Sequence, residues 1–341
     1  MLRKTILAMF IALLAGFMLT ACGTGEESNQ ENNDTNENTK ADAGSGDDNS
    51  SKSADSSESE VRVIQHAMGE TEVTGTPKRI VTLYQGATDA AIAMGVTPVG
   101  IVESWVEKPV YKYLRDDLDG VPIVGLETQP NLEEIAKLNP DLIIASKLRH
   151  EEIYDKLEQI APTVTHETVY EFKETVELMG EAMNMEEKAD EVLAAWDNRV
   201  ADFKAKVQEK LGDKWPLNVA LLNFRADHAR IYFTSFAGIV LNDLGFERPE
   251  NQQEDVWGIK LTSKESIPEM NADIFYIFMS DDEAVHQTYE EWTNHPLWKN
   301  LDAVQNDQVY LVDEVAWNMG GGILAANLML DDIYDRLGLE K

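Results

Sequence analysis

The chain has 341 residues and a formal net charge of −33, because 62 Asp and Glu residues outnumber 29 Lys and Arg residues. This balance argues against nucleic acid as a partner, since binding to phosphates requires basic patches. The single cysteine, Cys22, excludes disulfides within the chain and metal sites built from clustered cysteines. Because the chain as a whole is so acidic, any site for an anion must be made locally, by clustered arginines.

Residues 1–22 have the composition of a targeting segment, which is kept out of the fold. Arg3 and Lys4 precede an apolar run at Ile6–Phe17 that is too short for a spanning helix, which requires roughly 20 residues. The following Leu19–Cys22 resembles a bacterial lipobox. We predict a lipoprotein signal peptide with cleavage before Cys22 and lipidation of its sulfur. A cysteine that only happens to lie in a signal peptide is the alternative.

Residues 23–60 contain no aromatic, Leu, Ile or Met residue, and they carry eleven acids and two lysines, a net charge of −9. Such a segment cannot bury enough apolar surface to offset its chain entropy. We therefore predict a disordered acidic tether. The remaining residues, 61–341, carry 51 acids and 25 Lys and Arg, a net charge of −26.

Residues 61–170 show the alternation of strand and helix patterns that predicts an N-terminal α/β lobe. Asn131 is placed to cap the second helix. The predicted strands are 79–84, 99–102, 121–124 and 141–145, and the predicted helices are 88–94, 131–138 and 151–160, after which comes the segment 163–166.

Residues 171–212 are predicted to form a helical linker that contains one long helix, Met185–Lys210. Its apolar residues recur at steps of three and four, which places them on one stripe of a helix. At 1.5 Å per residue the helix would span roughly 39 Å, about the length of a domain. Asn184 and Glu187 have the spacing of a capping box at its start.

Residues 213–341 are predicted to form a C-terminal α/β lobe, with strands at 217–224, 230–233, 273–278 and 309–311 and helices at 237–244 and 324–337. At a constant offset of 132, Glu133 matches Glu265 and Asp141 matches Asp273. We interpret this as an α/β fold of two Rossmann-like lobes joined by a single long helix. Chance similarity between short α/β units is the alternative.

In open parallel α/β sheets, ligands bind outside the carboxyl ends of the strands. Arginine forms forked hydrogen bonds to carboxylates, and Trp and Tyr supply rigid walls. Arg149 could instead pair with Glu151 or Glu152, and a single histidine is more often structural than a ligand. Gln85, Asn223 and His228 lie at the same ends without an assigned role. The predicted ligand-binding residues are Tyr84, Trp105, Arg149, His150, Arg225, Arg230, Tyr232, Trp317 and Asn318.

Motifs of common enzymes are absent: there is no Walker phosphate loop, no G-x-S-x-G and no H-E-x-x-H. Gly320–Gly322 precedes a helix and could cradle an anion, although a tight strand-to-helix turn is the other interpretation. The six histidines lack metal-ligand spacing. We predict no catalytic residue and no metal bound directly by the protein.

The lipobox, the tether, the long helix and three short segments together resemble the iron-siderophore substrate-binding lipoproteins of ABC importers from Gram-positive bacteria, over residues 61–341. The segments are Pro77–Val81, Asn131–Ile144 and Ile160–Thr163. A narrower resemblance, to the YfiY-type proteins of Bacillus and the SirA-type proteins of staphylococci, rests on Lys147–Tyr154, Arg230–Tyr232, Leu244–Pro249 and Trp317–Gly322.

This resemblance implies a fold like that of class III periplasmic binding proteins and a lipid-anchored monomer on the extracellular face of the cell membrane. The implied ligand is a ferric siderophore of the citrate or hydroxycarboxylate type, without any cofactor, and the implied partners are an ABC permease and its ATPase. Glu133 and Glu265 would dock the permease, one acid on each lobe; capping of their helices is the alternative. Asp227 and His228 receive no role, because their segment varies among such proteins. Capture of haem or cobalamin and, less consistent with the sequence, a surface hydrolase using His150 and His228 are the competing functions.

Overall fold

The computed structural model describes residues 60–341. The predicted signal peptide, the Cys22 lipidation site and all but the last residue of the predicted tether lie outside the described residues. In the part of the chain that the structure describes, no helix is long and apolar enough to cross a membrane.

The N-terminal sheet has six strands in the order β6-β5-β4-β3-β7-β8, of which only β6 is antiparallel to its neighbour. The central strand β3 is buried at every residue, as expected for a parallel sheet covered on both faces. An antiparallel hairpin, which was not predicted, precedes the sheet. The strands are β1 (Val61–His66), β2 (Gly69–Thr74), β3 (Ile80–Thr82), β4 (Gly100–Glu103), β5 (Ile123–Leu126), β6 (Gln129–Pro130), β7 (Leu142–Ser146) and β8 (Thr163–His166).

Four short α-helices accompany this sheet: α1 (Gln85–Ala93), α2 (Leu132–Lys137), α3 (Lys147–His150) and α4 (Tyr154–Glu158). The Asn131 side chain accepts hydrogen bonds from the backbone N–H groups of Glu133 and Glu134, so the predicted cap of α2 is confirmed. The single helix predicted over 151–160 is instead a short 3-10 turn followed by α4.

The C-terminal sheet has the order β11-β10-β9-β12-β13, and β10 runs antiparallel to both of its neighbours. The antiparallel pair β9–β10 departs from the predicted repeat between the two lobes. In the N-terminal lobe, the strand that follows β3 in the chain is parallel to it. The strands are β9 (Val219–Phe224), β10 (Ala229–Tyr232), β11 (Gly258–Leu261), β12 (Ile274–Phe278) and β13 (Val309–Leu311), and the α-helices are α7 (Phe236–Leu244), α8 (Glu283–Thr293), α9 (Asp302–Gln305) and α10 (Ile323–Leu337).

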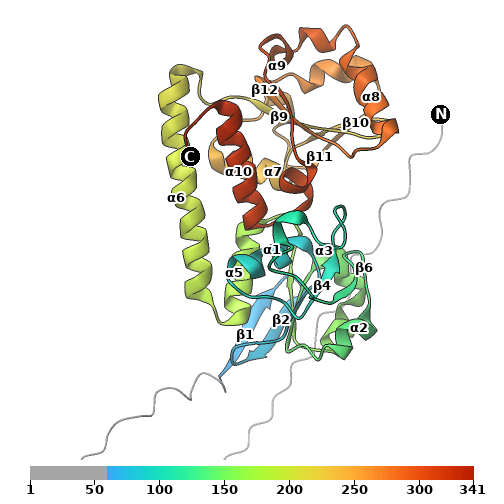
Figure 1. Cartoon of the computed structure of the whole chain (residues 1–341), viewed down its shortest axis with the longest axis vertical. Helices are drawn as coiled ribbons and strands as arrows, with labels where there is room; N and C mark the ends of the chain where they lie inside the picture. Colours follow the sequence, from blue (N-terminus) through green and yellow to red (C-terminus); the bar gives the residue numbers. More distant parts are fainter. Residues whose placement is uncertain (1–59) are drawn as a thin grey trace, which may run out of the picture. The chain divides into compact units, whose positions relative to one another are not determined.

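Helix α6 (Glu186–Leu211) has 26 residues and follows α5 (Phe172–Met183) in the chain. It runs alongside helices of both lobes (Figure 1). Its buried residues are those of the predicted stripe, Trp196, Val200 and Phe203 among them. The predicted capping box is wrong. Asn184 adopts a left-handed conformation that ends α5, and its side chain donates to Thr76 Oγ1 at 2.8 Å.

The main apolar core is shared by the two lobes, because it joins buried residues of α1, α5, α6, α7 and α10. Helix α10, near the C-terminus, lies against α1 of the N-terminal lobe (Figure 1). Asp89 of α1 caps α10 across this seam: its carboxylate accepts from the N–H groups of Leu324 and Ala325 at 2.7 and 3.0 Å. The helix N-terminus behind Gly320–Gly322 is therefore occupied by a side chain of the protein, which argues against an anion there. The predicted strand-to-helix turn is wrong, because the glycines join the π-helix η7 (Val315–Met319) to α10.

Candidate ligand-binding site

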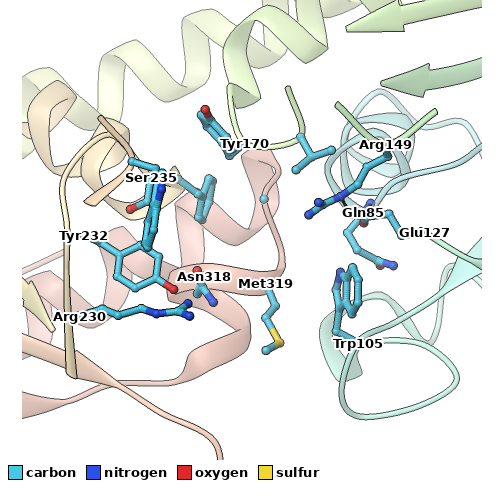
Figure 2. A pocket seen from close by; sticks show the side chains of 14 residues that line it. Gln85, Trp105, Glu127, Arg149, Tyr170, Arg230, Tyr232, Ser235, Asn318 and Met319 are labelled. Atoms are coloured by element: carbon cyan, nitrogen blue, oxygen red, sulfur yellow. Dashed lines mark hydrogen bonds and ion pairs between the residues drawn. The ribbon is translucent and has the colours of Figure 1, made fainter. Parts of the chain in front are cut away.

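A cavity of about 510 Å³ lies between the two lobes and is lined by residues from both of them (Figure 2). Five of the nine predicted ligand-binding residues line it: Trp105, Arg149, Arg230, Tyr232 and Asn318. Its other lining residues are Gln85, Glu127, Val169, Tyr170, Ser235, Phe236, Trp257, Met319 and Gly321. Trp105, Arg149 and Tyr232 lie at or just after the ends of strands, as predicted. Arg230 is instead the second residue of β10, and Asn318 lies in the π-helix η7 (Val315–Met319). The binding role of all five residues stays a prediction.

On the N-terminal side, Arg149 follows β7 and is fixed by the buried Glu127. Arg149 Nε donates to Glu127 Oε1 at 3.0 Å, and Glu127 Oε2 accepts from the backbone N–H of Gln85 at 3.2 Å. The side chain of Glu127 is 3% exposed, whereas that of Arg149 is 33% exposed. The Arg149 guanidinium also lies 6.0 Å from the ring centre of Trp105, within the range of a cation–π contact.

On the C-terminal side, Arg230 extends from β10. Like Arg149, it is held through Nε and lies beside a tryptophan ring. Its Nε donates to His228 Nε2 at 2.9 Å, and its guanidinium lies 5.5 Å from the ring centre of Trp257. The ring of Tyr232 packs edge-on against Trp257 at 5.4 Å. Arg149 and Arg230 point into the cavity from opposite sides (Figure 2).

The terminal nitrogens of these two arginines have no hydrogen-bond partner among residues 60–341. Six of the nine arginines in this range donate from a terminal nitrogen to a protein acceptor: Arg62, Arg79, Arg115, Arg199, Arg248 and Arg336. The other three are Arg149, Arg225 and Arg230, the arginines that the strand ends had singled out. A guanidinium held only through Nε presents its forked end to a ligand, and this fork matches a carboxylate.

Three predicted ligand-binding residues are corrected, because each is buried away from the cavity. Tyr84 is 0% exposed and its hydroxyl lies 3.2 Å from Thr175 Oγ1. Trp317 is 0% exposed and donates from Nε1 to Asp332 Oδ2 at 2.9 Å. His150 is 0% exposed, and burial lowers its pKa to about 4.

Arg225 does not line the cavity, and its binding role stays a prediction. It is partly buried, and its Nε has no hydrogen-bond partner among the described residues. Glu314 lies near enough to interact with it electrostatically. Burial raises the pKa of Glu314, and the charge of Arg225 opposes that increase.

Glu127, Tyr170, Ser235 and Trp257 line the cavity without having been identified from the sequence. Glu127 is one acid among many, and Tyr170 and Trp257 lie outside the ends of the predicted strands, so the strand-end rule could not find them. Within residues 60–341, no group of three His, Cys, Asp or Glu side chains is arranged to hold a metal ion.

The predicted docking residues occupy corresponding places in the two lobes. Glu133 is the second residue after its cap, Asn131, and Glu265 is the second residue after its cap, Ser263. Both glutamates are exposed. The two helices differ in kind, since α2 is an α-helix and its counterpart η5 (Lys264–Met270) is a 3-10 helix that contains Pro268.

Comparison with known proteins gives consistent matches. Residues 80–316 match a family model described as periplasmic binding protein. The chain is 49% identical over 266 residues to the achromobactin-binding periplasmic protein of Dickeya dadantii, covering 77% of this chain and 87% of that protein. It is 41% identical over 344 residues to the probable siderophore-binding lipoprotein YfiY of Bacillus subtilis, covering 97% and 98%.

Among solved structures, that of Staphylococcus aureus SirA complexed with staphyloferrin B matches with a TM-score of 0.79 and 50% sequence identity. The match covers 82% of this chain and 99% of that one. It confirms the predicted fold class, an α/β fold of two lobes joined by one long helix.

Proposed function

The chain belongs to the periplasmic binding protein family, and from that premise we propose that it is a receptor that captures a ferric siderophore and delivers it to an ABC importer for iron uptake. Proteins of this family bind substrates for transport and are not enzymes. The relatives and the solved complex described above support the siderophore, because each is named for a siderophore or for siderophore binding. The residues around the cavity therefore act by holding a ligand.

The observation that carries the ligand class is the pair of arginines that face each other with unpartnered terminal nitrogens. In a chain with so many acids, two such cations at one cavity favour an anionic ligand with oxygen acceptors on two sides. We infer a siderophore of the citrate or hydroxycarboxylate type, whose carboxylates the arginines bind. Trp105 and Trp257 supply aromatic surface beside these contacts. Iron would arrive already chelated by the siderophore's own oxygens, so the protein requires no cofactor.

The competing functions are less consistent with the site. The arginine pair favours a chelate with several carboxylates over haem. The hydrolase alternative is wrong, because the family is one of non-enzymatic transport proteins. Its two histidines are also already engaged: both ring nitrogens of His150 and of His228 contact protein groups.

The receptor would be held on the extracellular face of the cell membrane through lipidated Cys22 and would act as a monomer. A relative described as a lipoprotein aligns with 97% of this chain, which supports that location. It would pass its ligand to a permease driven by an ATPase, with Glu133 and Glu265 at the contact.

The test is a titration of tryptophan fluorescence with ferric citrate, a ferric hydroxycarboxylate siderophore, a ferric hydroxamate, haem and cobalamin. Trp105 and Trp257 both line the cavity, so binding of a ligand there should change their fluorescence emission. We expect the carboxylate chelates to bind most tightly. Arg149→Ala or Arg230→Ala should each weaken that binding by roughly 2–5 kcal/mol if the charge pair is well buried.

Replacement by lysine should not restore full affinity, because lysine lacks the forked geometry. Arg115→Ala is a matched control, since Arg115 is exposed and its side chain donates to the backbone oxygens of Val110 and Glu107. If both cavity variants bound every chelate as tightly as the parent, the arginines would lose their role. Preference for haem or cobalamin would overturn the ligand class.

A further inference from the structure

Each cavity arginine is held through Nε by a second residue, and the two holders are chemically different. Arg149 is held by a carboxylate, that of Glu127, whereas Arg230 is held by an imidazole, that of His228. His228 is itself held: its Nδ1 lies 2.5 Å from Asp227 Oδ1. The side chain of His228 is 7% exposed, whereas that of Asp227 is 76% exposed.

These contacts determine the protonation of His228. An arginine Nε always carries hydrogen and can only donate, so His228 Nε2 must accept. The imidazole proton is then on Nδ1, where the carboxylate of Asp227 accepts it. The arrangement requires the neutral Nδ1–H tautomer of His228.

We infer that Asp227 and His228 form a positioning relay for Arg230, and that protonation of His228 disrupts it and weakens ligand capture in mild acid. A proton on Nε2 would replace an acceptor by a donor and place a second cation 2.9 Å from the arginine. Histidine is the side chain whose charge ordinarily changes between pH 5 and 8. The inference rests on the proposed function, because Arg230 matters here as a ligand contact.

The charged groups that face His228 are the Asp227 carboxylate and the Arg230 guanidinium. Lys260 Nζ lies 3.9 Å from Asp227 Oδ2. The N-terminal side is not expected to respond in the same range. Its histidine, His150, contacts the backbone oxygen of Glu127, but burial lowers its pKa to about 4.

The test compares the parent with His228→Gln and His228→Ala by titration with ferric citrate and with a ferric hydroxycarboxylate siderophore at pH 7.5 and 5.5. A glutamine oxygen can accept from Arg230 Nε at either pH, whereas alanine removes the holder. At pH 7.5 we expect His228→Gln to bind within a few-fold of the parent and His228→Ala to bind roughly tenfold more weakly. Between pH 7.5 and 5.5 the parent should lose clearly more affinity than His228→Gln.

Comparing variants with one ligand cancels the pH dependence of the chelate itself. Glu127→Gln is the matched change on the other side of the cavity, and it should retain the parent's pH dependence. Equal pH dependence in the parent and His228→Gln, or unchanged affinity of His228→Ala at pH 7.5, would overturn the relay.

A second measurement needs no ligand. Nitrogen-15 NMR of the imidazoles, assigned with the His228→Gln variant, should show His228 as the Nδ1–H tautomer at pH 7.5, and the Nε2–H tautomer would refute the relay. Failure of every chelate to bind the parent would instead contradict the proposed function, while the NMR result would still decide the relay.

Discussion

His150 shows how a single buried side chain can make the fold sensitive to pH. Its Nδ1 accepts from the backbone N–H of Ser146 at 3.1 Å, and its Nε2 donates to the backbone oxygen of Glu127 at 2.9 Å. Only a neutral imidazole can make both bonds, because a protonated Nδ1 would face another donor. Desolvation by burial lowers the pKa of His150 from 6.5 to about 4.

We therefore predict that acidification from pH 6.5 to 4 destabilises the fold through His150. In this range the unfolded chain binds a proton that the folded chain excludes, so the free energy of unfolding rises with pH. Each pKa unit corresponds to about 1.4 kcal/mol, so the full effect is about 3 kcal/mol. Denaturant unfolding of the parent and of His150→Gln at pH 4, 5, 6 and 7 measures it.

The stability of His150→Gln should depend less on pH than that of the parent, even though carboxylates contribute to both. His286→Gln is the control, since the His286 side chain is 46% exposed and contacts Asp281. A pH dependence of His150→Gln that matches the parent would show that His150 does not titrate in this way.

Single residues also show what the strand-end rule can predict. The three corrected residues are direct neighbours of cavity-lining residues: Tyr84 precedes Gln85, His150 follows Arg149, and Trp317 precedes Asn318. The rule identifies which segment reaches the cavity. Which of two neighbouring side chains points into it depends on the local backbone and on packing with distant residues, and a sequence pattern does not contain that information.

At the scale of elements, periodic segments were predictable and local exceptions were not. The long helix α6 was placed to within one residue at each end, because its apolar stripe repeats over about five turns, from Ala189 to Val207. The β9–β10 hairpin was not foreseen. A strand pattern gives the presence of a strand and not its direction, and β10 pairs antiparallel with β9 only because the chain turns back within Arg225–His228.

The seam between α1 and α10 is a second element-scale feature, and it depends on one carboxylate. Asp89 is 0% exposed; besides capping α10, it accepts from the hydroxyl of Tyr113 at 2.8 Å. Gly322 must be glycine there, since a Cβ at this position would lie 2.3 Å from the Asp89 carboxyl carbon. Burial raises the pKa of Asp89 to about 6, although these hydrogen bonds oppose the increase.

We predict that Asp89→Ala lowers the free energy of unfolding by roughly 1–3 kcal/mol at pH 7, because buried donors lose their acceptor. Asp89→Asn should have an intermediate free energy of unfolding. Its amide offers one acceptor oxygen and one NH2 donor in place of the two acceptor oxygens of the carboxylate. The folded pKa of Asp89, about 6, exceeds the ordinary 3.8, so folded protein binds the extra proton between these values. The parent should therefore gain stability over Asp89→Asn as the pH falls from 6 to 4.

Thermal and denaturant unfolding of the three proteins at pH 4.5, 6 and 7 tests this prediction. The sign is informative because it is opposite to that of His150 in the same pH range. Equal stability of the parent and Asp89→Ala at pH 7 would mean that the carboxylate does not hold the seam.

At the scale of the whole described chain, the two lobes are joined by more than α6. Their shared core contains Trp196 of α6, Phe172 of α5, Phe236 of α7 and Met329 of α10. The rings of Trp196 and Phe236 both meet that of Phe172 edge-on, at 5.3 and 5.9 Å. A continuous core of this kind opposes hinge opening, so a partner would meet the two lobes in one arrangement.

That arrangement bears on docking, because Glu133 and Glu265 would approach a permease together. Each glutamate follows a helix cap, so each could also serve only to stabilise its helix. The two roles predict different outcomes for the Glu133→Ala/Glu265→Ala double variant. Loss of docking should reduce uptake of iron-loaded siderophore by cells and leave affinity and melting temperature nearly unchanged, whereas loss of a helix contact should lower the melting temperature and leave transport by folded protein intact.

The double change to lysine should reduce uptake further, since like charges would then face each other if the permease presents basic pockets. Glu134→Lys/Glu269→Lys is the matched control, because both of these glutamates are exposed and lie in the same two helices. Uptake should fall in the Glu133/Glu265 variant and remain near the parental level in the control. Normal uptake by a well-folded Glu133→Lys/Glu265→Lys variant would remove both residues from the docking surface.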